Sequence, residues 1–205
     1  MKKSTLAVMA IAGLLGASTA VAGDDGLYLL GEVGRITGNG GQSLLDHGLT
    51  AAGAVGFSSS VNAPTLYKLQ AGYQINRNWA VEGGYLGADN AHYSAAGGSL
   101  RRAVTGTASI NGWDLTAVGI LPVADKFSLL GKIGIADMQE KATTQRAGVS
   151  SSTSSTKTDL TYGIDAKYDF TDTIFMRVGL DSYNIGNSNY SVRNTMAMIA
   201  AGYKF

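Results

Sequence analysis

Residues 67–86 read YKLQAGYQINRNWAVEGGYL, and the rest of the chain repeats the pattern of this stretch. Apolar and polar residues alternate on both sides of a short turn at 76–78. Successive side chains of a strand point to opposite faces, so the alternation predicts two strands joined as a hairpin. The apolar face consists of Leu69, Ala71, Tyr73, Ile75, Trp79, Val81 and Tyr85. Because the opposite face holds charges and glycines, the pattern is typical of a barrel that stands in lipid.

Six further segments alternate in the same way and bring the predicted strand number to eight. They span 27–36, 113–121, 127–136, 160–170, 174–183 and 195–205. Strands of about 9–11 residues are long enough to cross a bilayer when tilted. A soluble eight-stranded barrel is the alternative, but it would not bury most of its charges and turn its apolar residues outward. The sequence therefore predicts an all-β fold, an eight-stranded antiparallel up-and-down transmembrane β-barrel.

The predicted connections alternate between long polar segments and short turns, as in bacterial outer-membrane barrels. The long segments, expected as external loops, cover about 37–64, 88–112, 137–158 and 184–194. The third contains a nearly pure serine and threonine run at 150–155, whose composition predicts a loop.

The N-terminus carries the features of an export signal. A basic start, an apolar run at 6–15 and the sequence Ala20-Val21-Ala22 predict a signal peptide over 1–22, cleaved after Ala22. An uncleaved anchor is the alternative, but a spanning helix needs about 20 apolar residues. We therefore expect residues 23–205 to form the barrel domain and to reside in the cell outer membrane.

Composition excludes several classes of function. The chain has no cysteine, which removes disulfides and thiolate metal sites, and its net charge of +1 gives no electrostatic case for nucleic acid binding. The two histidines, His47 and His92, fall in predicted loops, and no Ser–His pair lies on a predicted strand. We therefore expect no enzyme activity, no metal site and no cofactor.

With the apolar face outward, ten charged residues point into the lumen. The acidic set is Glu32, Glu82, Asp114, Asp165 and Asp181, and the basic set is Lys68, Lys132, Lys167, Arg177 and Lys204. The lumen of an eight-stranded barrel is only wide enough for side chains, so these charges must pair. Two interpretations remain open: a static polar core, or a gate at Glu82, Lys132 and Arg177 that opens a narrow path when ion pairs exchange partners.

The chain resembles the OmpA-type N-terminal transmembrane domain, a family of small eight-stranded outer-membrane barrels. The matching motifs are GYQIN at 72–76, VEGGY at 81–85, LTA at 115–117 with Pro122, Arg177, and the terminal YKF at 203–205. The resemblance implies that Glu82 pairs with Lys132 and Arg177. It also implies that the outer-membrane assembly machinery recognises Phe205 and Tyr203. A periplasmic peptidoglycan-binding domain, present in many such proteins, is not expected because the chain stops at Phe205.

Together these features predict an integral outer-membrane protein with a structural, membrane-integrity role and at most a narrow gated pore. The alternative is a surface adhesion or recognition protein that acts through its external loops. The expected partners are outer-membrane lipids, lipopolysaccharide and the assembly machinery, and the barrel is expected to be a monomer.

Overall fold

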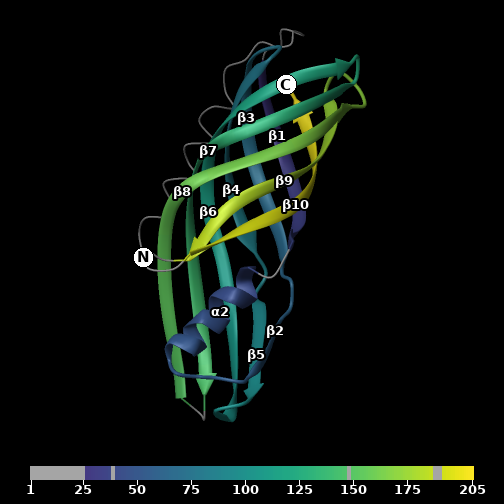
Figure 1. The fold of residues 1–205 in the computed structure, drawn as a ribbon. Coiled ribbons are helices and arrows are strands. Elements are labelled where there is room, and N and C mark those ends of the chain that lie inside the picture. The colour runs from purple at the N-terminus through teal and green to yellow at the C-terminus, as the bar shows by residue number, and fades with distance from the viewer. Residues whose placement is uncertain (1–25, 38–39, 147–148, 187–190) are drawn as a thin grey trace.

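The backbone forms a barrel that continues at one end into a long projection of strands (Figure 1). This computed structural model describes residues 26–37, 40–146, 149–186 and 191–205. The predicted signal peptide over 1–22 lies outside these residues and stays a prediction. Within the described residues, no helix is both long enough and apolar enough to cross a membrane.

The described chain contains ten strands and one helix. In order they are β1 (Gly26–Thr37), α2 (Gly40–Ala51), β2 (Ser58–Val61), β3 (Thr65–Asn76), β4 (Trp79–Ala88), β5 (Ala91–Gly97), β6 (Leu100–Ala124), β7 (Phe127–Arg146), β8 (Val149–Asp169), β9 (Ile174–Gly186) and β10 (Ser191–Lys204).

Eight of these strands close a hydrogen-bonded ring in the order β1, β3, β4, β6, β7, β8, β9, β10 and back to β1. All of the pairings are antiparallel, and each ring strand follows its neighbour along the chain. The ring closes between the first and last strands, where Tyr28 lies opposite Lys204 and Thr37 opposite Thr195. The predicted eight-stranded up-and-down barrel is therefore confirmed.

The outer face of the ring is apolar and exposed. Leu69, Ile133 and Ile164 leave 61–66% of their surfaces uncovered. Exposed aromatic residues gather at two levels; those nearer the short turns are Tyr73, Trp79, Tyr168, Phe170, Tyr203 and Phe205, and those at the opposite end are Tyr67, Tyr85, Trp113 and Tyr162. An apolar band between two aromatic girdles is the outer surface of a barrel that spans a bilayer.

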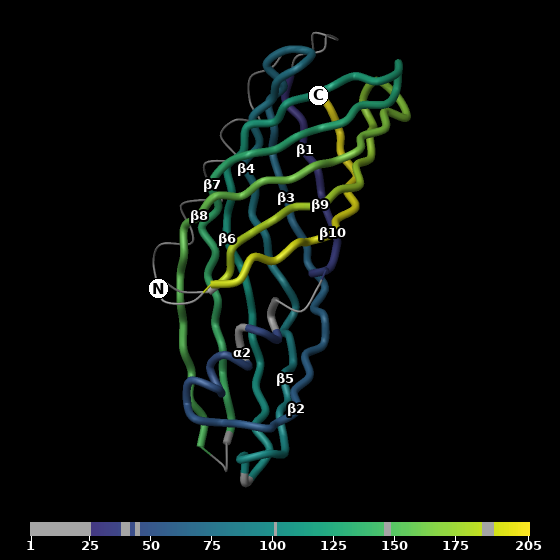
Figure 2. The backbone as a smooth tube through the Cα atoms, viewed as in Figure 1, coloured from purple at the N-terminus to yellow at the C-terminus, as the bar shows by residue number. Residues whose placement is uncertain are grey.

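The long polar segments are not simple loops, and this corrects the prediction (Figure 2). The segment at 88–112 forms β5 and the first half of β6, and the segment at 137–158 continues β7 and β8. The serine and threonine run at 150–155 belongs to β8, where Ser152 pairs with Thr143 of β7. A strand that meets water on both faces needs no apolar alternation, and threonine itself favours strands. The predicted loop at 37–64 contains α2 and β2.

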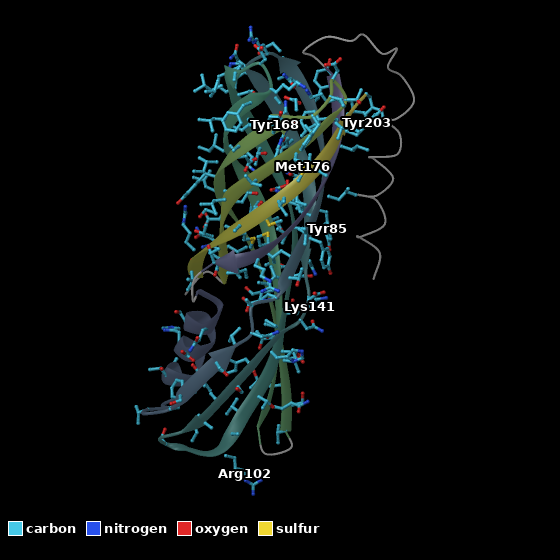
Figure 3. The ribbon with its side chains drawn as sticks, turned by 90° about the vertical axis from the view of Figure 1, so that its right-hand side faces the viewer. Tyr85, Arg102, Lys141, Tyr168, Met176 and Tyr203 are labelled. Carbon is cyan, nitrogen blue, oxygen red and sulfur yellow. The ribbon has the colours of Figure 1, made fainter. Side chains whose placement is uncertain are left out.

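The projection has its own apolar core. Leu49 of α2 packs on a cluster from the sheet and the following loop, made of Ala54, Tyr93, Ala95, Leu100 and Val104. The helix ends because Gly53 adopts a φ of 86°, and the N–H of Ala54 donates to the Leu49 carbonyl at 3.0 Å. Figure 3 shows Arg102 at the far end of the projection, with Tyr168 and Tyr203 at the opposite end of the molecule.

Tyr93 also ties the helix to the sheet through its hydroxyl, which donates to Asp46 Oδ1 of α2 at 3.1 Å. Burial and the neighbouring Asp46 carboxylate raise the pKa of Tyr93, so the hydroxyl keeps the proton that it donates.

Candidate functional site in the barrel lumen

The inward side chains form three layers along the barrel. The turn-end layer is an apolar cluster of Tyr28, Leu30, Ala80, Val118, Ile120, Leu130, Phe175 and Ala200. The layer next to the projection consists of Leu66, Leu86, Ala136, Met138, Tyr183, Ile185, Met196 and Met198, with Ile36, Ala88 and Ile110 packed against them. Most of the charged residues occupy inward positions between the two clusters; on β4, for example, Glu82 lies between Ala80 and Leu86. A polar layer is thus enclosed by apolar packing on both sides.

One ion pair joins opposite parts of the ring. Arg177 of β9 donates through Nη1 to Glu82 Oε1 of β4, and both side chains are buried. The Tyr28 hydroxyl donates to the same carboxylate oxygen at 2.5 Å. The guanidinium also lies over the rings of Tyr28 and Phe175, 5.2 and 5.1 Å from their centroids. The contact predicted between Glu82 and Arg177 is therefore present.

The Tyr28 ring occupies space that a side chain on β3 would fill. A Cβ added to Gly72 would overlap this ring. The glycine therefore allows the Tyr28 hydroxyl to sit beside Glu82, and this role of Tyr28 was not foreseen from the sequence.

A second network is separate from the first and centres on Asp181 of β9. Its carboxylate bridges two lysines, with Lys132 Nζ at 2.7 Å and Lys68 Nζ at 3.6 Å. Lys132 also binds Asp165 at 3.0 Å, and Lys68 binds Asp114 at 2.6 Å. All five side chains are buried. The network runs continuously from β6 through β3, β9 and β7 to β8.

The predicted pairing of Lys132 with Glu82 is wrong. Lys132 of β7 lies opposite Gly163 of β8, which in turn lies opposite Asp181 of β9. Because Gly163 has no side chain, the lysine can extend across β8 to reach Asp181. Glu82 lies on β4, on the other side of β6 from β7, and the nearer aspartates bind the lysine instead.

The remaining predicted lumen charges lie at the edges of these networks. Glu32 is opposite Lys68 in the β1–β3 register. With its amide nitrogen turned toward Glu32, Gln70 donates to that carboxylate and accepts from Lys68 Nζ at 3.0 Å. At the turn end, Asp169 binds both Lys167 and Lys204, at 3.0 and 2.8 Å.

Two lumen partners were missed from the sequence. Asp169 has the same parity as Asp165 and Lys167, so continuing the alternation of β8 by one more inward position would have identified it. Tyr183 accepts from Lys68 Nζ at 2.9 Å and donates to Asp114 Oδ2 at 2.8 Å. Its inward position followed from the pattern, but nothing in the pattern marked it as a link between two charges.

The chemistry of this lumen is that of paired, hydrogen-bonded charge. Among the residues that the structure describes, no group of three or more His, Cys, Asp or Glu side chains is arranged to hold a metal ion. Two buried atoms of the first pair, Glu82 Oε2 and Arg177 Nε, have no hydrogen-bond partner within the same described residues. The pair is therefore held by the contact between Arg177 Nη1 and Glu82 Oε1, by the Tyr28 hydroxyl and by the two rings over which the guanidinium lies.

The predicted assembly signal lies on the outside. Tyr203 and Phe205 are both exposed at the turn end, and their rings meet edge to face with centroids 5.1 Å apart. They take no part in the lumen networks.

Comparisons with known proteins agree with this architecture. A family model described as outer membrane protein beta-barrel domain matches residues 7–205. No match was found among curated proteins.

Three solved structures share the fold. The outer membrane protein OprG from Pseudomonas aeruginosa has a TM-score of 0.54 at 14% identity, covering 91% of this chain and 99% of that one. Ail, the attachment invasion locus protein of Yersinia pestis, has a TM-score of 0.51 at 19% identity, with 89% and 99% covered. The N-terminal β-barrel domain of Pseudomonas aeruginosa OprF has a TM-score of 0.50 at 13% identity, with 88% and 99% covered.

Proposed function

Because this chain belongs to the outer membrane protein beta-barrel domain family, we propose that it is a structural barrel of the outer membrane with a closed lumen. The observation that carries the proposal is the apolar cluster beside the projection. Strands β3, β4, β7, β9 and β10 contribute to it, and Leu66 and Met196 within it are fully buried. An ion would have to open this cluster, break the buried ion pairs and then open the turn-end cluster.

Conductance measurements test this proposal. Purified, folded protein in a planar bilayer is expected to give no single-channel steps, because apolar constrictions that exclude water block ions. A variant with Met138, Met196 and Met198 changed to alanine loosens only one cluster and is expected to remain silent. Reproducible steps from the folded wild type that are absent from a heat-unfolded sample would contradict the closed barrel.

A second candidate function, surface recognition, is supported by the projection. Strands β6, β7 and β8 run from the barrel into it without a break, and α2 packs on it over a separate apolar core. Such a stiff extension holds its far surface away from the membrane, where a partner outside the cell can reach it. This is a different use of the barrel, as an anchor for a binding surface.

Shortening the projection separates the two functions. Deleting 143–146 together with 149–152 removes four paired rows of the β7–β8 hairpin and preserves the alternation of the remaining residues. The barrel is expected to keep its heat-modifiable gel mobility. If the projection mediates recognition, bacteria that display the shortened chain lose most of their adherence to cultured epithelial cells. Unchanged adherence would remove this second candidate.

The proposed partners follow from the outer surface. Arg35 and Arg193 are exposed beyond the aromatic girdle on the projection side, where arginine can bind the phosphates of lipopolysaccharide. Arg193 also lies over the Tyr162 ring, 4.7 Å from its centroid. We further propose that the assembly machinery reads Phe205 and Tyr203 and that the barrel works as a monomer.

A further inference from the structure

A groove lies on the outer, lipid-facing surface of the ring, near the short turns. Its volume is about 530 Å³, and its lining includes Trp79, Gly119, Leu121, Leu129, Gly131 and Ile164. The closed-barrel proposal does not depend on this surface.

The floor of the groove is one row of the sheet in which two neighbouring residues are glycines, and Leu121 and Leu129 line it from another outward row. Trp79 lies opposite Gly119, Gly119 opposite Gly131, and Gly131 opposite Ile164. Adjacent strands are about 4.8 Å apart, so the backbones that carry the two walls are roughly 14 Å apart. A Cβ on Gly131 would meet nothing within 4 Å, so the floor is bare backbone there. A Cβ on Gly119 would meet the Trp79 ring at 3.7 Å, so this ring lies beside Gly119 and forms one side of the open space. This space fits an extended hydrocarbon chain.

Two hydrogen bonds hold the Trp79 side of the groove in place. The Asn78 side-chain amide donates to the Ile120 carbonyl at 3.1 Å, and the Ile120 N–H donates to the Asn78 carbonyl at 2.7 Å. These two bonds fix the turn that precedes Trp79 against β6. The groove therefore exists before any ligand arrives, which lowers the entropy lost on binding.

The charges at the end of the groove indicate which lipid would occupy it. Arg77 directly precedes Asn78, and Lys126 lies in the turn between β6 and β7; both are exposed at the level of the turns. One acid, Asp125, is next to Lys126, so the two turns have a net positive charge. Cationic side chains at this depth match the phosphate of a lipid headgroup.

We propose that this groove binds one phospholipid from the leaflet at the turn end of the barrel. An acyl chain lies over Gly131, between the Trp79 ring and Ile164, and the phosphate lies near Arg77 and Lys126. A second copy of the chain is the other occupant that such a groove could take, and the test below separates the two.

The chain offers a matched pair of glycines for this test. Gly131→Leu fills the groove, and Gly31→Leu adds the same side chain to β1, which does not line the groove. Gly31 is also exposed, and its Cβ would likewise meet nothing within 4 Å. Both variants are therefore expected to fold, which heat-modifiable gel mobility checks.

Native mass spectrometry of detergent-solubilised protein with added phosphatidylglycerol measures the bound lipid. Wild type and Gly31→Leu are expected to retain one lipid per barrel, and Gly131→Leu to bind at least about tenfold more weakly, a change of 1.4 kcal/mol. Equal retention by all three proteins would overturn the proposal. A wild-type dimer that carries no lipid and is lost in Gly131→Leu would also overturn it, in favour of a second copy.

The headgroup part of the proposal has its own measurement. Wild type is expected to prefer phosphatidylglycerol to diacylglycerol, which lacks the phosphate, and the double variant Arg77→Gln with Lys126→Gln is expected to lose that preference. A preference unchanged in the double variant would exclude the two cations from the site.

Tryptophan fluorescence tests the groove in membranes, because Trp113→Phe leaves Trp79 as the only tryptophan. Its quenching by a small fraction of brominated phosphatidylglycerol should fall when Gly131→Leu is added, and unchanged quenching would count against the groove.

Discussion

Replacing Arg177 by methionine is expected to lower the free energy of unfolding by about 3–5 kcal/mol, the cost of leaving a buried charge without its partner. Glu82 is fully buried and accepts from Arg177 and Tyr28. The tyrosine hydroxyl alone cannot balance a carboxylate charge. Urea unfolding in lipid vesicles, followed by gel mobility, measures the change.

Two comparisons show whether this loss comes from the pair. Arg35→Met removes an exposed arginine and is expected to change the stability by no more than about 0.5 kcal/mol. The double variant Glu82→Gln with Arg177→Met removes both charges and is expected to be more stable than Arg177→Met alone. If the double variant loses the sum of the two single losses, the two residues are not coupled.

The same cycle applied to Lys132 distinguishes the observed pairing from the one that sequence resemblance implied. Coupling of about 1–3 kcal/mol is expected between Lys132 and Asp181, which are in contact. Coupling between Lys132 and Glu82 is expected to be much smaller. The reverse order would restore the pairing implied by the family resemblance.

Replacing Gly134 by valine is expected to destabilise the barrel by about 3 kcal/mol, the upper part of the range for overpacking. A Cβ at this inward position would overlap the backbone carbonyl oxygen of Leu115 on β6. Backbone cannot rotate away as a side chain can, so β6 and β7 would have to separate at this row. Urea unfolding, as for Arg177, gives the size of the loss.

The control for Gly134 lies on the same strand. Gly131 faces outward, and a Cβ there would meet nothing within 4 Å. Gly131→Val is therefore expected to keep nearly the stability of the wild type. Equal losses at the two positions would mean that any side chain in place of a β7 glycine is harmful, and that the close approach to Leu115 is not the cause.

The barrel itself could be predicted from the sequence because its outer face is apolar and its inner face is not. A slip of one residue would move Leu69 and Tyr73 into the lumen and Lys68 into lipid, so the alternation fixes both the strands and their orientation. This is why the fold class and the inward parity of Glu82, Lys132 and Arg177 could be predicted.

The part of the projection formed by β7 and β8 could not be predicted in the same way. Thr143 and Ser152 pair across β7 and β8, yet both are polar and both lie where either face can meet water. Hydrophobic periodicity is the main sequence signal for a strand, and it vanishes when neither face is buried against apolar groups. Polar strands and polar loops then look alike.

The partners within the lumen were predicted only in part, for a geometric reason. Alternation tells which way a side chain points, but not how far around the ring its partner lies. Lys132 reaches Asp181 because Gly163 lies between them. This depends on the register of three neighbouring strands, which the pattern of one strand does not contain.

The closing pair of strands has a consequence for the order of events during assembly. Every ring pairing except one joins ring strands that follow each other in the chain, whereas β1 and β10 are the first and the last of the ring strands. Contacts between distant segments carry the largest loop-closure cost and form late. Glu82 and Arg177 are 95 residues apart, and they meet across the lumen after the ring has closed. We therefore expect this ion pair to have little effect on the rate of insertion and folding. We expect it to slow the unfolding of the completed barrel.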